Sequence, residues 1–151
     1  MIIRKAKIDD LKRVSYVTRL AWKVPYNKLG FVNSFHENKQ LVDLVKEKKM
    51  NILVAIEDNK IVGAIRYELR GEGVVFFSKL VVLSTYRRRG IGTKLISKLE
   101  KISKNKGVGE ICLDIMEEKL LNPFYQKIGY RIVKKIKHLD HHDIYMKKRI
   151  K

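Results

Sequence analysis

A run of basic residues and glycines at positions 87–93 has the composition of an anion-binding turn. It reads Arg-Arg-Arg-Gly-Ile-Gly-Thr and lies between an apolar stretch at 74–82 and a stretch of helical period at 94–104. A helix that begins at such a turn presents backbone N–H groups without intrahelical partners, together with the positive end of its dipole. Glycine lets an anion approach the backbone, and arginine adds donors suited to phosphate oxygens. The run predicts a phosphate site, although an ordinary tight turn has the same pattern.

A second motif lies at 122–130 and reads Asn-Pro-Phe-Tyr-Gln-Lys-Ile-Gly-Tyr. Its first part is typical of a short helix that carries Phe-Tyr, and its last part places a glycine and an aromatic residue before a strand. The motif lies about 35 residues after the turn at 87–93.

The elements that must position these motifs follow from hydrophobic periodicity and turn chemistry. Asp9 predicts the N-cap of the first helix and Pro25 its end. The order of elements predicts an α/β (α+β) fold in one domain over 1–151, with a single mixed, mostly antiparallel sheet of about six to seven strands and helices on both faces. The predicted strands are 2–5, 51–57, 61–69, 74–82, 111–116, 130–137 and 143–148, and the predicted helices are 9–25, 35–48, 94–104 and 120–128.

The composition limits which classes of partner and which cellular compartment we expect. The 151 residues include 34 Lys and Arg against 16 Asp and Glu, a net charge of +18. Such a charge favours phosphate-rich ligands or nucleic acid, but the lysines are spread along the chain, which is typical of a composition that only maintains solubility. Residues 1–5 lack a signal-peptide core and no apolar run is long enough for a membrane span, so we expect a cytoplasmic protein without membrane contact. The single cysteine, Cys112, excludes an internal disulfide and is interpreted as a packing residue.

The two motifs together resemble the GNAT superfamily of N-acetyltransferases. The resemblance rests on the order of the elements, on the Arg87-x-x-Gly90-x-Gly92 turn after the fourth strand, and on the Phe124-Tyr125-x-x-x-Gly129-Tyr130 junction. It implies a GNAT-like fold and an acetyltransferase that uses acetyl-CoA as cosubstrate and no metal. It also implies direct attack by a primary amine in a ternary complex, the amine belonging to a small molecule or to a protein.

The resemblance also implies which residues meet the cosubstrate. In the family the pyrophosphate lies on the backbone of the glycine turn, and the preceding strand binds the pantetheine arm through its backbone. The tyrosine of the second motif protonates the leaving thiolate, a role that matches Tyr125. By position, the cofactor-binding residues are Leu80, Val81 and Val82 on the strand, and Arg87, Arg88, Arg89, Gly90, Ile91, Gly92 and Thr93 at the turn.

Two positions depart from the family pattern. Many members have an asparagine seven residues before the tyrosine, where this chain has Glu118, and Asn122 is our candidate for the same cofactor contact. Many members carry a glutamate base on the fourth strand, but 74–82 contains no acid. Asp114 is our candidate base, and a solvent-facing strand residue is the alternative interpretation. Glu68, Glu72 or an ordered water could also take the proton.

Other groups have a structural and a functional interpretation. His138, His141 and His142 with Asp140 could bind a metal, but adjacent histidines on a strand point to opposite faces, so we expect a hydrated hairpin and no metal. By resemblance, the segment that holds Trp22, Tyr26, Phe31, Phe35 and His36 lines the acceptor site; packing of the helices onto the sheet is the alternative interpretation.

A different class of function is compatible with the charge. On the same fold, the chain could be a basic module associated with nucleic acid or ribosomes, with weak or absent acyl transfer. The helix at 94–104 carries lysines without exposed aromatic residues, which does not favour nucleic acid. Related folds often pair through their late strands, which makes a homodimer an expectation of the resemblance.

Overall fold

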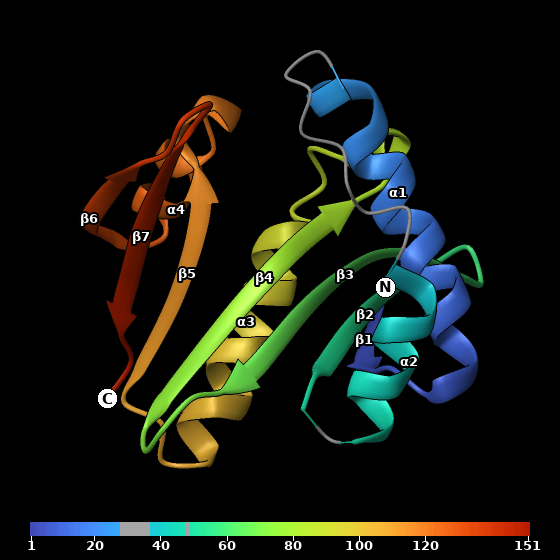
Figure 1. Cartoon of the computed structure of the whole chain (residues 1–151). Helices are drawn as coiled ribbons and strands as arrows, with labels where there is room; N and C mark the ends of the chain where they lie inside the picture. Colours follow the sequence, from blue (N-terminus) through green and yellow to red (C-terminus); the bar gives the residue numbers. More distant parts are fainter. Residues whose placement is uncertain (28–36, 48) are drawn as a thin grey trace. The chain divides into compact units, whose positions relative to one another are not determined.

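The computed structural model describes residues 1–27, 37–47 and 49–151 (Figure 1). Within these ranges the order of elements is the predicted one, and most strands begin and end within a residue of their predicted bounds. The elements are β1 (Ile2–Lys5), α1 (Leu11–Asn27), α2 (Glu37–Lys46), β2 (Asn51–Glu57), β3 (Lys60–Leu69), β4 (Val74–Val82), α3 (Ile91–Asn105), β5 (Glu110–Met116), α4 (Asn122–Lys127), β6 (Arg131–Lys137) and β7 (His142–Arg149).

The start of the first helix differs from its prediction. A 3-10 turn at Ile8–Asp10 precedes α1, and the carboxylate of Asp10, not of Asp9, accepts the Lys7 N–H at 2.7 Å. Arg4 Nη1 lies 2.7 Å from the same Asp10 carboxylate and lowers its pKa. The prediction that Asp9 is the N-cap was therefore wrong, because the carboxylate of Asp10 accepts the hydrogen bonds from the Lys7 N–H and from Arg4.

The end of the first helix also differs. α1 continues through Pro25 to Asn27. A proline has no N–H, so the carbonyl four residues earlier, that of Ala21, receives no intrahelical hydrogen bond. Arg87 Nη2 donates to this carbonyl at 3.2 Å. The predicted stop at Pro25 was wrong, and a donor distant in sequence occupies the acceptor that the proline leaves.

The chain divides into two compact units, and each is described by itself. Unit 1 comprises residues 1–68 and 79–99, and unit 2 comprises 69–78 and 100–151. Hydrogen-bonded neighbours follow the order β1-β2-β3-β4-β5-β7-β6 in one seven-stranded sheet. The pairing of β4 with β5 is parallel and the pairings β1–β2, β2–β3, β5–β7 and β6–β7 are antiparallel, so the sheet is mixed and mostly antiparallel, as predicted.

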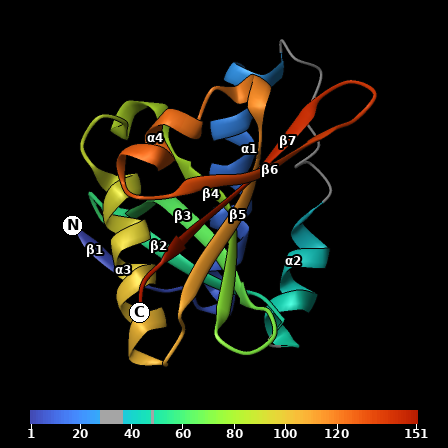
Figure 2. The same cartoon turned by 90° about the vertical axis from the view of Figure 1, so that its left-hand side faces the viewer.

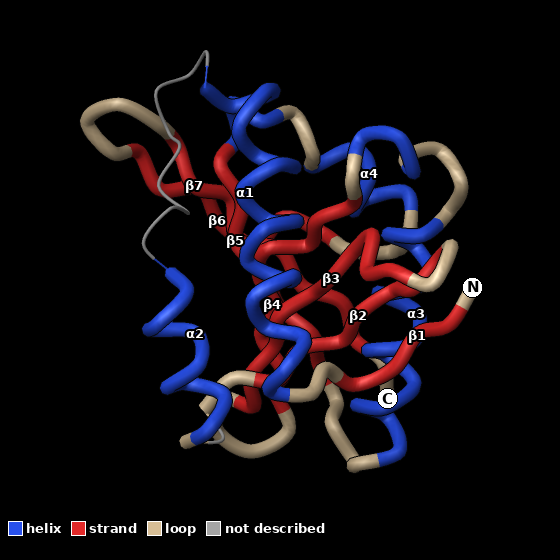
Figure 3. The backbone as a smooth tube through the Cα atoms, turned by 90° about the vertical axis from the view of Figure 1, so that its right-hand side faces the viewer, coloured by secondary structure: helices blue, strands red, loops and turns tan. Residues whose placement is uncertain are grey.

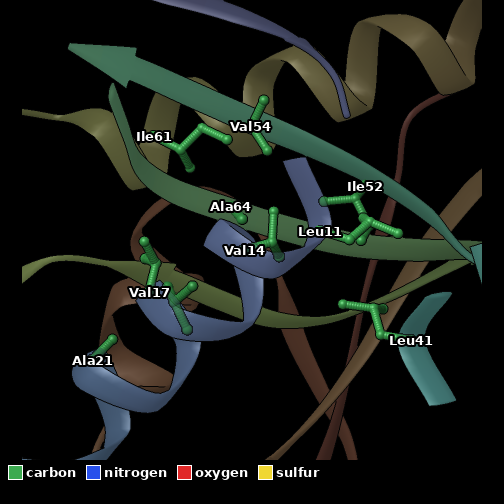
Figure 4. Packing of buried hydrophobic residues seen from close by; sticks show 10 residues of the cluster. Leu11, Val14, Val17, Ala21, Leu41, Ile52, Val54, Ile61 and Ala64 are labelled. Carbon is green, nitrogen blue, oxygen red and sulfur yellow. The ribbon is translucent and has the colours of Figure 1, made fainter. Parts of the chain in front are cut away.

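Unit 1 has its core between two helices and the β2–β3 hairpin. The strands of the hairpin meet at a two-residue turn in which Asp58 and Asn59 have φ of 50° and 60°. α1 runs beside these strands (Figure 3) and buries one face against them (Figure 4). The buried cluster consists of Leu11, Val14, Val17, Ala21, Leu41, Ile52, Val54, Ile61, Ala64 and Val81.

Unit 2 contains a parallel ladder and a long hairpin. The β4–β5 ladder runs from Val74↔Glu110 to Phe77↔Leu113. β6 and β7 pair antiparallel and meet in the loop at 138–141 (Figure 2). Among the described residues, no helix is both long and apolar enough to cross a bilayer.

Candidate functional site

The glycine turn leads directly into a helix in unit 1. α3 begins at Ile91, so Gly92 and Thr93 belong to its first turn rather than to the loop before it. The Lys94 N–H donates to the Gly90 carbonyl at 3.0 Å and closes the first helical turn. The N–H groups of Ile91, Gly92 and Thr93 precede this bond, and a helix supplies no acceptor for them. They and the helix dipole form the positive end at which an anion is stabilised.

Backbone conformation explains one of the two glycines in this turn. Gly90 has a φ of 76°, in the left-handed region. A Cβ built at Gly90 meets no atom within 4 Å, so glycine is favoured here by the backbone conformation and not by a lack of room for a side chain. Arg88 has a φ of 62° and also adopts the left-handed region, at a cost of about 1–2 kcal/mol for a residue other than glycine.

The three arginines have different surroundings. The Arg87 guanidinium donates from Nε to the Val82 carbonyl at 3.2 Å and from Nη2 to the Ala21 carbonyl at 3.2 Å. The Arg89 guanidinium lies 5.0 Å from the centroid of the Tyr86 ring, and all three arginines are exposed. The side chain of Arg87 therefore joins α1 to the end of β4, a role that a purely phosphate-binding interpretation of the three arginines did not include.

The contact of Arg87 with α1 predicts a coupling between two distant positions. Arg87→Ala should lower the free energy of unfolding by about 1–2 kcal/mol, because two carbonyls lose a charged donor. In a Pro25→Ala background the new N–H can bond the Ala21 carbonyl, so the same substitution should cost at least about 0.5 kcal/mol less. Urea unfolding of the four proteins in this double-mutant cycle measures the difference, with the exposed Arg88→Ala as control. Equal costs in both backgrounds would show that the Ala21 contact contributes nothing.

The end of β4 is fixed tightly within unit 1. A Cβ at Gly63 would lie 3.0 Å from the Val81 carbonyl oxygen, so β3 approaches β4 more closely here than most side chains tolerate. The Leu83 N–H donates to the Val62 carbonyl at 2.8 Å. Lys79 has a φ of 49°, which breaks the regular strand conformation just before residues 80–82. Within this segment Val81 is buried, and Leu80 and Val82 are half-buried.

In unit 2, Tyr125 lies in a cluster of aromatic rings. Only 4% of its surface is exposed, and its ring centroid lies 5.0 Å from that of Phe124, 5.9 Å from that of Phe77 and 6.1 Å from that of Tyr130. The Tyr130 N–H donates to the Tyr125 carbonyl at 3.0 Å, which closes α4. Packing on three sides and this backbone bond therefore hold the Tyr125 ring in place.

A charged pair supports the neighbouring tyrosine. Lys148 Nζ lies 3.1 and 3.0 Å from the two carboxylate oxygens of Glu100, and the Tyr130 hydroxyl donates to Oε1 of the same carboxylate at 3.4 Å. Burial, followed by the negative charge of Glu100, raises the pKa of Tyr130 above its ordinary value. Tyr130 thus stays protonated and serves as a structural neighbour of Tyr125. Sequence reasoning missed Glu100 and Lys148, which lie 48 positions apart in the chain.

Asp114 and Tyr125 lie on opposite faces of the strands of unit 2. Phe77 pairs with Leu113, both are buried, and Tyr125 packs against Phe77. Successive residues of a strand point to opposite faces, so Asp114 faces away from Leu113 and from Tyr125. The β4–β5 ladder ends at Phe77↔Leu113, one residue before Asp114.

The two candidates for the cofactor asparagine have different surroundings. Asn122 is the first residue of α4, half-buried, and three residues before Tyr125, so the two lie on neighbouring positions of one helix face. Glu118, at the usual asparagine position, accepts the backbone N–H of His142 and thereby holds the start of β7.

The proposed acceptor-lining residues fall largely outside what is described. Phe31, Phe35 and His36 lie outside the described residues. Trp22 and Tyr26 lie in α1, where the structure describes their backbone but not their side chains.

Comparison with known proteins agrees with the motifs. A family model for the acetyltransferase (GNAT) domain matches residues 22–148. The ribosomal protein bS18-alanine N-acetyltransferase of Haemophilus influenzae is 34% identical over 133 residues, which cover 87% of this chain and 82% of that protein. The glucosamine 6-phosphate N-acetyltransferase of Trypanosoma brucei brucei is 39% identical over 70 residues, and the match spans 46% of each chain. The crystal structure of an aminoglycoside 6'-N-acetyltransferase complexed with coenzyme A has a TM-score of 0.81 at 23% identity, covering 100% of this chain and 98% of that one.

Proposed function

The chain belongs to the GNAT acetyltransferase family and transfers acetyl from acetyl-CoA to an amine, and from this premise we propose which of its residues bind and react. The turn at Arg87–Thr93 holds the pyrophosphate of acetyl-CoA on its backbone N–H groups. Residues 80–82 bind the pantetheine arm through their backbone, and Asn122 contacts the cofactor near Tyr125. The observation that carries the proposal is the start of α3 at Ile91, directly after the left-handed Gly90.

The chemistry needs an acid for the departing sulfur. When the amine attacks the thioester carbonyl, the C–S bond breaks and the CoA thiolate leaves. Tyr125 donates its hydroxyl proton to that sulfur, because a fixed phenol can transfer a proton without reorganising. The amine attacks directly, so no covalent enzyme intermediate forms and Cys112 has no nucleophilic role. Burial raises the pKa of the Cys112 thiol, which agrees with this assignment.

Asp114 is the base in this proposal. An amine must lose a proton before or during its attack, and the carboxylate of Asp114 faces the side opposite Tyr125. What supports the choice of Asp114 is that the β4–β5 ladder ends one residue before it, so this carboxylate lies where the two strands stop pairing.

For the acceptor we favour the α-amine of a protein N-terminus over a small polyamine. The relative that is 34% identical over most of this chain acts on ribosomal protein bS18-alanine, by its name. The net charge of +18 repels a polycationic acceptor. A cytoplasmic location and a homodimer stay predictions.

An acceptor panel tests this proposal. Acetyl-CoA consumption is measured with four acceptors: a peptide that begins with alanine, a peptide with a free lysine side chain and an acetylated N-terminus, spermidine, and an aminoglycoside. The alanine-initiated peptide should give the highest kcat/KM, and blocking its N-terminus should abolish the reaction. Calorimetry should show acetyl-CoA binding on the micromolar scale. A higher kcat/KM for spermidine than for the alanine peptide would overturn the acceptor assignment. If calorimetry detected no acetyl-CoA binding, the assignment of the cofactor site would be overturned instead.

A further inference from the structure

The loop between β6 and β7 gathers two imidazoles and a carboxylate in unit 2. His138 follows the last residue of β6, and Asp143 is the second residue of β7. The His138 N–H donates to the His141 carbonyl at 2.8 Å, which closes the hairpin and brings these two residues opposite each other. From the sequence we expected a hydrated hairpin without a metal, because adjacent histidines on a strand point to opposite faces. His138 and His141 are three positions apart, and their rings stack with centroids 4.6 Å apart.

The three side chains bring their ligand atoms close together. His138 Nε2 lies 2.9 Å from Asp143 Oδ2, and His141 Nε2 lies 3.4 Å from Asp143 Oδ1. One ligand atom from each residue can be chosen so that all three lie within 4.8 Å of one another. Two ligands at adjacent positions of a metal with bonds of about 2.1 Å are about 3.0–3.4 Å apart. The two histidine–aspartate distances, each to a different oxygen of Asp143, lie in or next to this range.

A further carboxylate orients one of the histidines. His141 Nδ1 lies 2.7 Å from Asp140 Oδ1. A ligating histidine in proteins usually donates its other ring N–H to a carboxylate, which fixes the tautomer and the direction of the ring. A carboxylate only accepts, so Nδ1 carries the proton of this bond, and Nε2 is the ring nitrogen that lies toward Asp143. The pair Asp140–His141 therefore has the arrangement of an outer carboxylate and an inner ligand.

The types of the three ligands determine which metal ions the site favours. Two imidazoles and one carboxylate favour zinc and other late first-row metals over magnesium and calcium, which prefer oxygen ligands. Side-chain exposure is 42% for His138, 23% for His141 and 20% for Asp143, so an ion can enter from solvent and keep water in its open positions. Asp140 adds a negative charge beside the set in a chain that is otherwise strongly basic.

We propose that His138, His141 and Asp143 form a binding site for a divalent late first-row metal such as Zn²⁺, which links the two strands of the β6–β7 hairpin. None of the three ligands is among the residues assigned to acetyl transfer, so the proposal does not depend on that assignment. Two of its ligands come from the two ends of the loop and the third from the start of β7. The bound ion consequently joins three points of one hairpin.

Calorimetric titration of the untagged, full-length protein with ZnCl₂ tests the site. We expect one Zn²⁺ per chain in the wild type and a rise in Tm at saturation. His141→Gln should abolish binding at this stoichiometry. Asp140→Asn should weaken it by about 10–100-fold, as outer carboxylates do. His142→Gln is the matched control, because His142 is the neighbouring imidazole but lies outside the set, with its Nδ1 3.6 Å from Glu118.

Each outcome of this titration decides the proposal. Unchanged Zn²⁺ affinity in His141→Gln, or equal loss in His142→Gln, would assign the binding elsewhere and overturn it. Absence of binding by the wild type at millimolar Zn²⁺ would also overturn it. A metal-free Tm and circular dichroism spectrum are recorded for every variant. If His141→Gln does not fold, His138→Gln takes its place, since it removes the more exposed ligand.

Discussion

Replacing Tyr125 with Phe should lower kcat by about 10²–10⁴-fold, the usual contribution of a positioned general acid. Acetyl-CoA affinity should change little, because the substitution keeps the ring that packs against Phe77, Phe124 and Tyr130. The loss follows from the departing thiolate, which then leaves without a proton from the protein. Steady-state kinetics with saturating acceptor measures kcat, and calorimetry measures the dissociation constant of acetyl-CoA.

Tyr130→Phe is the matched control for this result. Tyr130 belongs to the same ring cluster and is similarly buried, with 2% of its surface exposed, but its hydroxyl donates to Glu100. Its removal should lower stability by about 1 kcal/mol, the typical value of a hydrogen bond, with a small effect on kcat. Equal losses of kcat in the two variants would mean that Tyr125 acts through packing. An unchanged kcat for Tyr125→Phe would remove Tyr125 from the mechanism.

Gly90→Val should weaken acetyl-CoA binding by about 10–100-fold, which corresponds to the loss of one hydrogen bond to a charged group. Valine disfavours the left-handed conformation that Gly90 adopts at a φ of 76°, so the turn must change. The N–H groups of Ile91 and its neighbours then point away from the place of the anion. The rise in the dissociation constant is measured by calorimetry, and KM for acetyl-CoA should rise in parallel.

Gly107 provides a control that isolates strain from function. It follows the other end of α3, its φ is 78°, and a Cβ there also meets no atom within 4 Å. Gly107→Val should therefore carry a similar strain, about 1–2 kcal/mol, and leave acetyl-CoA affinity unchanged. If both variants lost affinity equally, the effect of Gly90→Val would be a general loss of stability, and the assignment of the turn would be wrong.

The sequence was sufficient for features that depend on local pattern. The hairpin strands at 51–57 and 61–69 were predicted within one residue because β-branched residues flank a turn with Asp58 and Asn59. The place of the glycine turn at 87–93, between a strand and a helix, was also predicted correctly. Such features need only neighbouring residues, whose spacing the sequence shows directly.

Features that depend on distant residues were missed. Pro25 was predicted to end the first helix, since nothing nearby in sequence could replace its missing hydrogen bond; the donor is 66 residues away from Ala21. The surroundings of Tyr130 were missed for the same reason, as Glu100 is on α3 and Lys148 on β7. The grouping of His138 with His141 depends on the hairpin register, which the residue types alone do not specify.

The bond between Arg87 and the Ala21 carbonyl gives these positions an order in which they can change during evolution. A lineage that first replaces Pro25 regains a helical hydrogen bond, and position 87 is then free to vary. A lineage that first replaces Arg87 leaves the carbonyl without a donor and loses stability. In a family whose turn is interpreted mainly as a cofactor site, an arginine here can therefore persist because of a proline more than sixty positions earlier.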